Sequence, residues 1–357
     1  MASALGAVTG TNNRLGFKRA SKVCVILVDG LGAENIRQAA GHAPYLSTAL
    51  RASKSINTVF PTTTAAAITS FGVGTTPSKH GVFGYSVYER TSGTVRNLLS
   101  GWGPDFVPGD FQKLPSLVAA ARNAGVDFFS VGPGEYADSG FTHLNLSGST
   151  YRPAKTFDER VRETKAILAR KSKSLTYLYF PELDATAHAF GVTSAQWLNK
   201  LEDLDAVIRQ LTKDLPADTG VVLTADHGVV DVAPQNQILL DELAIEGLIS
   251  VTGDPRNTFL YFAEDVEVSH VKSELSQKLA GTVHVADVKD LVAAGWFEAH
   301  IVNAGYLPDL FLISQDGYAC YHRGFAKPQS LKMIGQHGGF TTTELSVPLL
   351  KYGVFGD

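Results

Sequence analysis

Acidic and imidazole side chains follow three apolar segments of this sequence. Residues 22–29 end in Asp29, residues 175–180 precede an Asp-x-x-x-His sequence, and residues 220–224 precede an Asp-His pair. Each segment has the character of a buried parallel strand, and ligands in open α/β sheets lie at the carboxyl ends of such strands. We therefore expect six side chains, one of them from a later Gln-His-Gly-Gly sequence, to meet at one sheet edge: Asp29, Asp184, His188, Asp226, His227 and His337.

This combination of groups indicates a metal centre. An aspartate after a strand is commonly a turn former or a helix cap, and an Asp-His pair four residues apart is commonly a solvated helix face. Three carboxylates and three imidazoles at one edge, however, would repel or lose hydration without a cation to balance them. Aspartate and histidine together suit zinc, with manganese and iron as alternatives. The two cysteines, Cys24 and Cys320, are too few for a disulfide scaffold or a cysteine-rich zinc module.

The elements that position these residues alternate between strand and helix. Besides the three segments above, the pattern predicts strands over 55–60 and 126–131, and helices over 33–39, 44–52, 111–124, 157–170 and 194–211 and from residue 64. Such alternation predicts an α/β fold, with a mostly parallel central sheet sandwiched by helices. The pattern changes near Ile238, where short strands and helices predict a small α+β insertion over 238–330. The catalytic core would then comprise 1–237 and 331–357, with 345–350 as the last piece of the sheet.

Composition restricts the kinds of partner. The 357 residues are 44% hydrophobic and 18% charged, which permits a large core and excludes a disordered chain. A net charge of −4 argues against a nucleic-acid polymer or an anionic membrane as partner. The sequence has neither an apolar stretch of the roughly 20 residues needed to span a bilayer nor a secretory signal at its start. These features predict a cytoplasmic protein that is a monomer or a small homo-oligomer.

The order of the motifs resembles the alkaline phosphatase superfamily, and most of all its nucleotide pyrophosphatase/phosphodiesterase branch, to which phosphonoacetate hydrolases are related. That branch has a strand followed by Asp-Gly, a Thr or Ser nucleophile on a helix, Asp-x-x-x-His, Asp-His-Gly and a late His-Gly. The corresponding segments here are Val28-Asp29-Gly30, Phe60-Pro61-Thr62-Thr63-Thr64, Asp184-Ala185-Thr186-Ala187-His188, Asp226-His227-Gly228 and His337-Gly338-Gly339. The resemblance extends from Val23 to Leu350.

The resemblance implies two divalent cations, zinc first and manganese as the alternative, and a phosphorylated nucleophile. One cation would be bound by Asp184, His188 and His337, and the other by Asp29, Asp226 and His227. The Phe-Pro-Thr-x-Thr pattern assigns the nucleophile to Thr64, which would also be a ligand of the second cation, while spacing alone leaves Thr62 and Thr63 as alternatives. Coordination to a cation lowers the pKa of a hydroxyl, so the implied reaction is hydrolysis through a phosphothreonine intermediate.

Three positions depart from the pattern of the branch. Tyr85 stands where the branch carries an asparagine that donates to a phosphate oxygen, and a phenol donates its single hydrogen bond in a different geometry. Ala65 follows the nucleophile where nucleotide-cleaving members carry a phenylalanine that stacks on the base. Tyr179 is the counterpart of the second stacking aromatic. We therefore expect Tyr85 and Tyr179 to bind substrate, and nucleotide specificity stays open.

The expected substrate is a small-molecule phosphodiester, pyrophosphate or phosphonate. A phosphodiesterase or nucleotide pyrophosphatase is the leading hypothesis, with a phosphomonoesterase or a phosphonate hydrolase on the same metal site as alternatives. A sulfatase is disfavoured because the nucleophile segment lacks a Cys/Ser-x-Pro-x-Arg sequence. The alternative of another class is a non-catalytic, metal-dependent ligand-binding protein, against which the complete ligand set argues.

Overall fold

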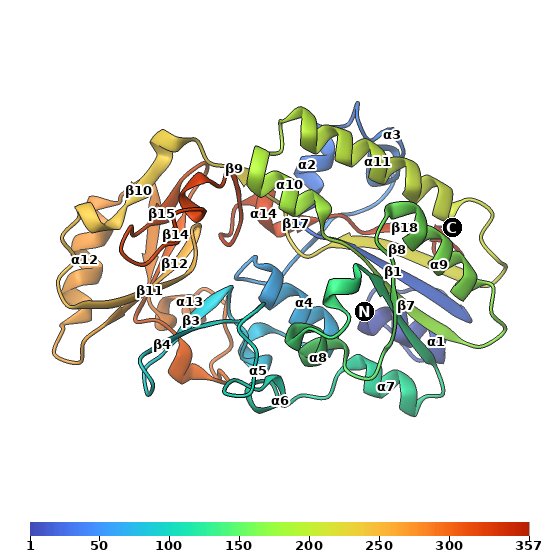
Figure 1. Cartoon of the computed structure of the whole chain (residues 1–357), viewed down its shortest axis with the longest axis horizontal. Coiled ribbons are helices and arrows are strands. Elements are labelled where there is room, and N and C mark those ends of the chain that lie inside the picture. Colours follow the sequence, from blue (N-terminus) through green and yellow to red (C-terminus); the bar gives the residue numbers. More distant parts are fainter. Residues whose placement is uncertain (357) are drawn as a thin grey trace.

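A six-stranded sheet forms the centre of one half of the molecule (Figure 1). The computed structural model describes residues 1–356. The strand order is β18-β8-β1-β7-β5-β6, and only the edge strand β18 runs antiparallel to its neighbour. These strands are β1 (Lys22–Val28), β5 (Asp127–Gly132), β6 (Thr150–Pro153), β7 (Ser174–Phe180), β8 (Thr219–Ala225) and β18 (Leu350–Gly353). The predicted α/β class with a mostly parallel sheet is confirmed.

Helices cover both faces of this sheet because its strands are apolar on both sides. Along β1, Cys24 and Ile26 pack into one core, whereas Val23 and Val25 pack into the other. The first core is closed by α2 (Ala33–Gln38), α3 (Pro44–Arg51), α9 (Phe157–Leu168), α10 (Glu182–Phe190) and α11 (Ala195–Thr212). The second is closed by α1 (Ala2–Thr9), α4 (Thr64–Val73), α7 (Leu117–Asn123) and α8 (Gly140–Leu146).

The long helix α11 shows how the local sequence sets an element. The side chain of Ser194 accepts the backbone N–H of Trp197 and so caps the first turn. Trp197, Leu201, Leu204 and Ile208 then recur at helical spacing and are fully buried against the sheet. No helix within residues 1–356 is both long enough and apolar enough to traverse a lipid bilayer.

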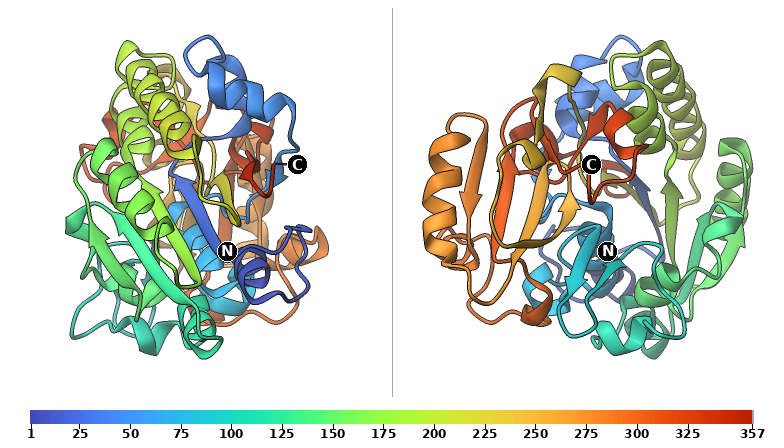
Figure 2. Two further views of the ribbon diagram at one scale, coloured as in Figure 1. Left: turned by 90° about the vertical axis from the view of Figure 1, so that its right-hand side faces the viewer. Right: turned by 60° about the vertical axis from the view of Figure 1, so that its left-hand side comes forward.

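A second, antiparallel sheet lies beside the first, at the orange end of the molecule (Figures 1 and 2). Its order is β11-β12-β14-β13. It comprises β11 (Leu248–Asp254), β12 (Asn257–Phe262), β13 (Val283–Ala286) and β14 (Leu310–Ser314), with α12 (Val268–Lys278), α13 (Val288–Ala293) and the strand pair β10 (Gln237–Leu239) and β15 (Ala319–Tyr321) around it. The hairpin of β3 (Ser86–Glu89) and β4 (Thr94–Asn97) packs against β11. The division of the chain at 238 and 330 stays a prediction.

Several predicted element boundaries are wrong, and prolines explain three of them. The segment 55–60 contains only the short strand β2 (Ile56–Asn57), which pairs with β17 (Ser346–Val347) outside the central sheet. Pro61 follows this segment and has no N–H with which to continue a strand ladder. The helix predicted from residue 111 begins at Leu117, because Pro115 disfavours helical backbone before it and Ser116 caps the helix; a separate turn, α6, spans Pro108–Phe111. Pro348 interrupts 345–350, so the last strand begins only at Leu350. Helix α1 was not predicted.

Candidate active site

Three neighbouring strands end at the same level and place the first site residues side by side. The register pairs Val28 of β1 with Phe180 of β7 and with Ala225 of β8. Asp29 and Asp226 directly follow these strand ends, and helix α10 begins just after β7. The carboxylates that were predicted from strand ends therefore share one edge of the sheet.

Gly30 shows why an Asp-Gly sequence suits the end of β1. Its backbone has a φ of +69°, in the left-handed region that favours glycine. A Cβ at this position would lie 2.9 Å from the Cβ of Asp184. The backbone N–H of Gly30 also donates to Oδ1 of Asp226 at 3.1 Å. The glycine thus allows carboxylates from three elements to approach one another.

The six predicted ligands form two adjacent clusters. Within each cluster, one oxygen or nitrogen from every member lies within 4.8 Å of the others; the clusters are Asp184, His188 and His337, and Asp29, Asp226 and His227. The rings of His227 and His337 stack with centroids 3.7 Å apart, so the clusters touch. His337 arrives from the loop after β16 (Gly335–Gln336).

All three histidines are oriented by backbone carbonyl groups. A carbonyl oxygen only accepts hydrogen bonds, so Nδ1 of each ring carries the proton, and the lone pair of Nε2 is available to bind a metal ion. The Nδ1 atoms of His227, His188 and His337 lie 3.2, 2.7 and 3.0 Å from the carbonyl oxygens of Gly228, Gly335 and Thr62 respectively. The Nε2 atoms face the carboxylates: His188 Nε2 lies 3.1 Å from Asp184, and His227 Nε2 lies 3.5 Å from Asp29.

The carboxylates have buried oxygen atoms without hydrogen-bond partners. Within residues 1–356, Oδ1 of Asp29, Oδ1 of Asp184 and Oδ2 of Asp226 are buried and accept no hydrogen bond. Leaving such an atom unsatisfied is costly, and an anionic one costs more. Divalent cations between these oxygens and the three Nε2 atoms would remove that cost, so the donor set fits the predicted pair of metal ions.

The pKa values of the carboxylates shift in opposite directions in the two clusters, upward for Asp29 and downward for Asp184. Burial, followed by the charges of Asp226 and Asp184, raises the pKa of Asp29 well above its usual value. Burial also opposes the charged forms in the other cluster, but the pairing of Asp184 with His188 prevails there. That pairing lowers the pKa of Asp184 and raises the pKa of His188 to about 9. The raised pKa of Asp29 therefore reflects its burial first and then its repulsion by two neighbouring carboxylates.

Tyr179 and Thr64 both reach the cluster that contains Asp29. The hydroxyl of Tyr179 donates to Oδ2 of Asp29 at 2.5 Å. Thr64 is the first residue of α4, and its Oγ1 lies 3.2 Å from Nε2 of His227. Both residues line a cavity of about 480 Å³ that also borders Asp29 and Asp184.

The three consecutive threonines have different surroundings. The hydroxyl of Thr62 is fully buried and donates to the carbonyl oxygen of Gly339 at 2.7 Å. The hydroxyl of Thr63 caps α4 by accepting the N–H of Ala66. Only Thr64 lines the cavity among these three.

Tyr85 lies away from this cavity. Its side chain is 39% exposed and does not line the cavity that borders Thr64. Its backbone N–H donates to Oδ2 of Asp254 at 3.1 Å. The substrate-binding role of Tyr85 stays a prediction.

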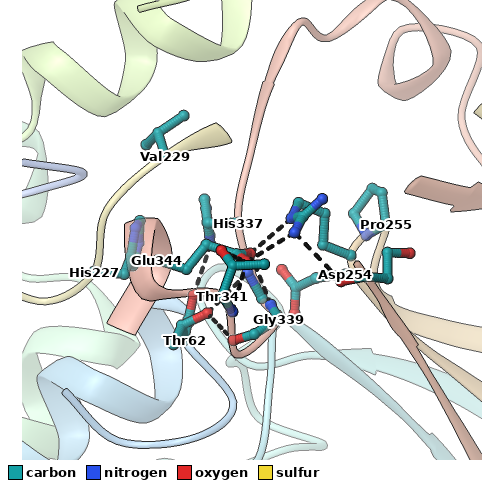
Figure 3. Close-up of polar contacts among 12 residues, drawn as sticks. Thr62, His227, Val229, Asp254, Pro255, His337, Gly339, Thr341 and Glu344 are labelled. Carbon is teal, nitrogen blue, oxygen red and sulfur yellow. Dashed lines mark hydrogen bonds and ion pairs between the residues drawn. The ribbon is translucent and has the colours of Figure 1, made fainter. Parts of the chain in front are cut away.

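Asp254 is a buried carboxylate near the centre that sequence reasoning missed. It ends β11 of the second sheet, and burial raises its pKa to about 7, although the charges of His227 and His188 oppose this shift. Figure 3 shows Asp254 on the opposite side of Gly339 from Thr62. The Asp-Pro-Arg-Asn sequence at a strand turn was the available signal.

An ion pair joins the second sheet to the loop that carries His337. Arg256 and Glu344 are both fully buried, and the guanidinium donates to the two carboxylate oxygens at 2.7 and 2.9 Å. Glu344, in α14 (Thr342–Leu345), in turn accepts the N–H of Gly339 at 2.9 Å (Figure 3). Thr62 donates to the carbonyl of Gly339 and accepts from the Gly338 N–H and from Nδ1 of His337, and together with the ion pair these bonds fix the position of His337.

Residues 23–340 match the family model for type I phosphodiesterase / nucleotide pyrophosphatase. The chain belongs to the type I phosphodiesterase/nucleotide pyrophosphatase family. The match includes all six predicted metal ligands and Thr64, and the relationship to this branch of the alkaline phosphatase superfamily is confirmed.

Solved structures show the same fold as this family member. Mouse ectonucleotide pyrophosphatase/phosphodiesterase 5, an inactive variant with a threonine replaced by alanine in complex with AMP, has a TM-score of 0.73 and 18% identity, over 93% of this chain and 88% of that chain. The human protein of that name has a TM-score of 0.72 and 15% identity with the same coverage. GPI ethanolamine phosphate transferase 1 of Chaetomium globosum is 30% identical over 96 residues, which are 26% of this chain and 10% of that protein. The chain thus spans about a tenth of the length of that relative.

Proposed function

We propose that the protein is a metal-dependent hydrolase of small-molecule phosphodiesters that uses Thr64 as its nucleophile. The observation that carries the proposal is the position of the Thr64 hydroxyl, 3.2 Å from Nε2 of His227 and at the wall of the cavity. The hydroxyl of Thr62 is already bonded to the carbonyl of Gly339, and the hydroxyl of Thr63 caps helix α4. Family membership and the inactive threonine variant of the mouse relative support the same assignment.

Two cations, zinc or alternatively manganese, would be held by the two clusters. Asp184, His188 and His337 would hold one, and Asp29, Asp226 and His227 the other, with Thr64 as a further ligand. Such cations lower the pKa of a hydroxyl and neutralise charge that develops on phosphoryl oxygens. The buried carboxylate oxygens without partners support this occupancy.

The chain itself supplies the nucleophile and its orientation. Oγ1 of Thr64 forms a bond to phosphorus while the bond to the departing ester oxygen breaks, and water later hydrolyses the phosphothreonine. Because Thr64 begins α4, the positive end of that helix favours the anionic phosphoryl group. The hydrogen bond from Tyr179 favours the ionised form of Asp29 and so opposes the rise in its pKa that burial causes.

A diester suits the cavity better than a monoester. A monoester dianion carries an extra negative charge, which calls for a basic side chain or a further cation. The cavity beside Thr64 is lined by described residues that include no lysine or arginine. The nearby Arg160 is paired with both carboxylate oxygens of Glu182. A phosphomonoesterase or phosphonate hydrolase remains an alternative, as does a non-catalytic metal-dependent binder.

Comparison of three substrates separates these alternatives. With zinc-loaded protein, the proposal predicts faster hydrolysis of a bis-aryl phosphate than of an aryl monophosphate or phosphonoacetate. Acid-quenched reactions with the bis-aryl phosphate should yield a peptide that carries a phosphate with the retained aryl ester on Thr64, and Thr64→Ala should abolish turnover while the metal content stays unchanged. Thr63→Ser keeps the capping hydroxyl and serves as the control. Phosphorylation elsewhere, or full activity of Thr64→Ala, would refute the assignment.

The AMP complex of the mouse relative supports a nucleotide as one candidate ligand. Location in the cytoplasm and assembly as a monomer or small homo-oligomer stay predictions from the sequence.

A further inference from the structure

Two loops carry the three side chains of one candidate metal site, which we call the Asp29 cluster. Asp29 begins the loop between β1 and α2, and Asp226 and His227 begin the loop after β8. The loops approach each other closely at two glycines: a Cβ on Gly32 would lie 2.8 Å from the Cα of Gly228. The position of one loop relative to the other therefore decides whether the three side chains can surround one cation.

A single buried side chain, that of Asn35 in the first turn of α2, joins these two loops. Asn35 is 2% exposed. Its Oδ1 accepts the N–H of Gly32 at 3.1 Å in the first loop and the N–H of Val229 at 3.1 Å in the second. Its Nδ2 donates to the carbonyl oxygen of Val229 at 3.0 Å. Gly32 lies three positions after Asp29, and Val229 lies two positions after His227 (both shown in Figure 3).

The chemistry of an amide explains why asparagine suits this place. The amide oxygen has two lone pairs, one for each N–H, and the amide nitrogen supplies the donor for the carbonyl group. A carboxylate has no donor for the Val229 carbonyl, and an apolar side chain would leave three buried backbone groups without partners, which is costly. The three bonds of the Asn35 side chain all go to backbone groups, so it acts on the loops and not on the ligand atoms.

The other candidate metal site, which we call the Asp184 cluster, is assembled differently. Asp184 and His188 lie one turn apart on the single helix α10, so that helix itself sets their spacing. His337 is held by its bond to the carbonyl of Thr62 and by the turn that follows it. The Asp184 cluster therefore does not depend on the contact between the two loops that Asn35 joins.

We propose that Asn35 is a positioning residue for the Asp29 cluster: it fixes the loop after β1 against the loop after β8 and so places Asp29 opposite Asp226 and His227. This inference rests on the proposed function, in which these side chains hold one of two cations. Without the amide, the buried backbone groups of both loops regain partners only if water enters or the loops move. Either change takes Asp29 away from the position that a shared cation requires.

Zinc affinity, measured by chelator competition, tests the inference without relying on turnover. Residues that orient metal ligands from outside the coordination shell typically contribute about 10–100-fold to affinity. In Asn35→Ala, one of the two zinc-binding events should therefore weaken by at least about 10-fold, while the other changes by less than about twofold. A role in stability alone would lower the urea midpoint of the metal-free protein and leave both affinities unchanged.

Asn13 provides the matched control. Its amide also bonds both backbone groups of one residue: it accepts the N–H of Phe17 at 2.8 Å and donates to the Phe17 carbonyl at 3.0 Å. Phe17 stacks on Phe355, which lies against Gly220 near the start of β8, at the opposite end of that strand from the metal clusters. Asn13→Ala should lower the urea midpoint but leave both zinc affinities unchanged.

Two backgrounds assign the weakened binding event to a cluster. In His337→Ala the remaining zinc ion should occupy the Asp29 cluster, and in His227→Ala it should occupy the Asp184 cluster. Adding Asn35→Ala should weaken zinc binding by at least about 10-fold in the first background and leave it unchanged in the second.

A milder variant and the wild type complete the test. If Asn35→Ala does not fold, Asn35→Ser, which retains a hydroxyl, should show the same selective loss at a size of at least about threefold. Unchanged affinity for both ions in the folded variant, or equal weakening of both, would overturn the inference and leave the proposed function intact. A wild-type protein that binds no zinc would instead overturn the proposed function, and the inference with it.

Discussion

Breaking the buried ion pair between Arg256 and Glu344 should destabilise the protein and loosen one metal site. In Arg256→Met the carboxylate of Glu344, which is fully buried, is left without a counter-charge. The carbonyls of Asp316 and Tyr318 also lose the donors that reach them at 2.7 and 2.6 Å. Removing one partner of a buried pair destabilises by about 3–5 kcal/mol, a large share of the roughly 5–15 kcal/mol that stabilises a typical protein.

A double-mutant cycle isolates the pair. Glu344→Gln should also be costly, because it leaves the Arg256 cation without a counter-charge. The double variant should be less destabilised than the sum of the single variants by about 1–3 kcal/mol, measured by urea unfolding. Arg323→Met is the control: its guanidinium is 51% exposed and pairs with Asp241 at the surface, so it should cost less than about 1 kcal/mol.

The same cycle tests the link from this pair to the metal centre. Glu344 accepts the N–H of Gly339, which follows the His337 turn. Glu344→Gln should therefore weaken one of two metal-binding events by about 10–100-fold in chelator competition, with a smaller effect on the other. Additive stabilities, or unchanged affinity for both ions, would refute this account of how His337 is held.

Three further predictions concern single groups. Burial raises the pKa of Asp254 from 3.8 to about 7, so between these pH values the folded metal-free protein binds a proton that the unfolded chain does not. Its stability should therefore fall as the pH rises from about 4 to 7, by up to about 4 kcal/mol. Asp254→Asn should abolish that part of the pH dependence in urea unfolding, and an unchanged profile would contradict the prediction. Tyr179→Phe removes the hydroxyl that donates to Asp29 and should weaken the binding of one metal ion, measured by chelator competition. Tyr177 makes no hydrogen bond to Asp29, so Tyr177→Phe should leave the affinity for both ions unchanged. Chelation should lower the midpoint of thermal unfolding and zinc should restore it, since cations bind the folded clusters; an identical midpoint would argue against them.

The central strands and the convergence of the six candidate ligands were predictable because local patterns indicate them. Apolar runs such as residues 22–28 are buried on both faces, and parallel strand ends meet at one edge whatever lies between them. The segment around Thr58 was not predictable in this way. The hydroxyl of Thr58 donates to the carbonyl of Asp226, 168 positions away. The backbone of this segment is thus positioned by a contact with a distant residue rather than by a local strand pattern.

Contacts between distant segments also explain why Asp254 and Arg256 were missed. Arg256 pairs with Glu344 across 88 positions, and a single arginine between two apolar strands carries no sign of its partner. Similarly, the sequence left three threonines as alternatives, because the contacts that distinguish Thr62 depend on the turn after His337. The local pattern predicts where ligands arise, whereas the residues that hold them depend on tertiary contacts.

The number of metal ions per chain tests the central claim most directly. Elemental analysis of zinc-loaded, dialysed protein should find two zinc ions per chain for the wild type, and one each for His337→Ala and His227→Ala, which remove a donor from different clusters. One ion or none in the wild type, or the same count in all three proteins, would contradict a centre built from two clusters.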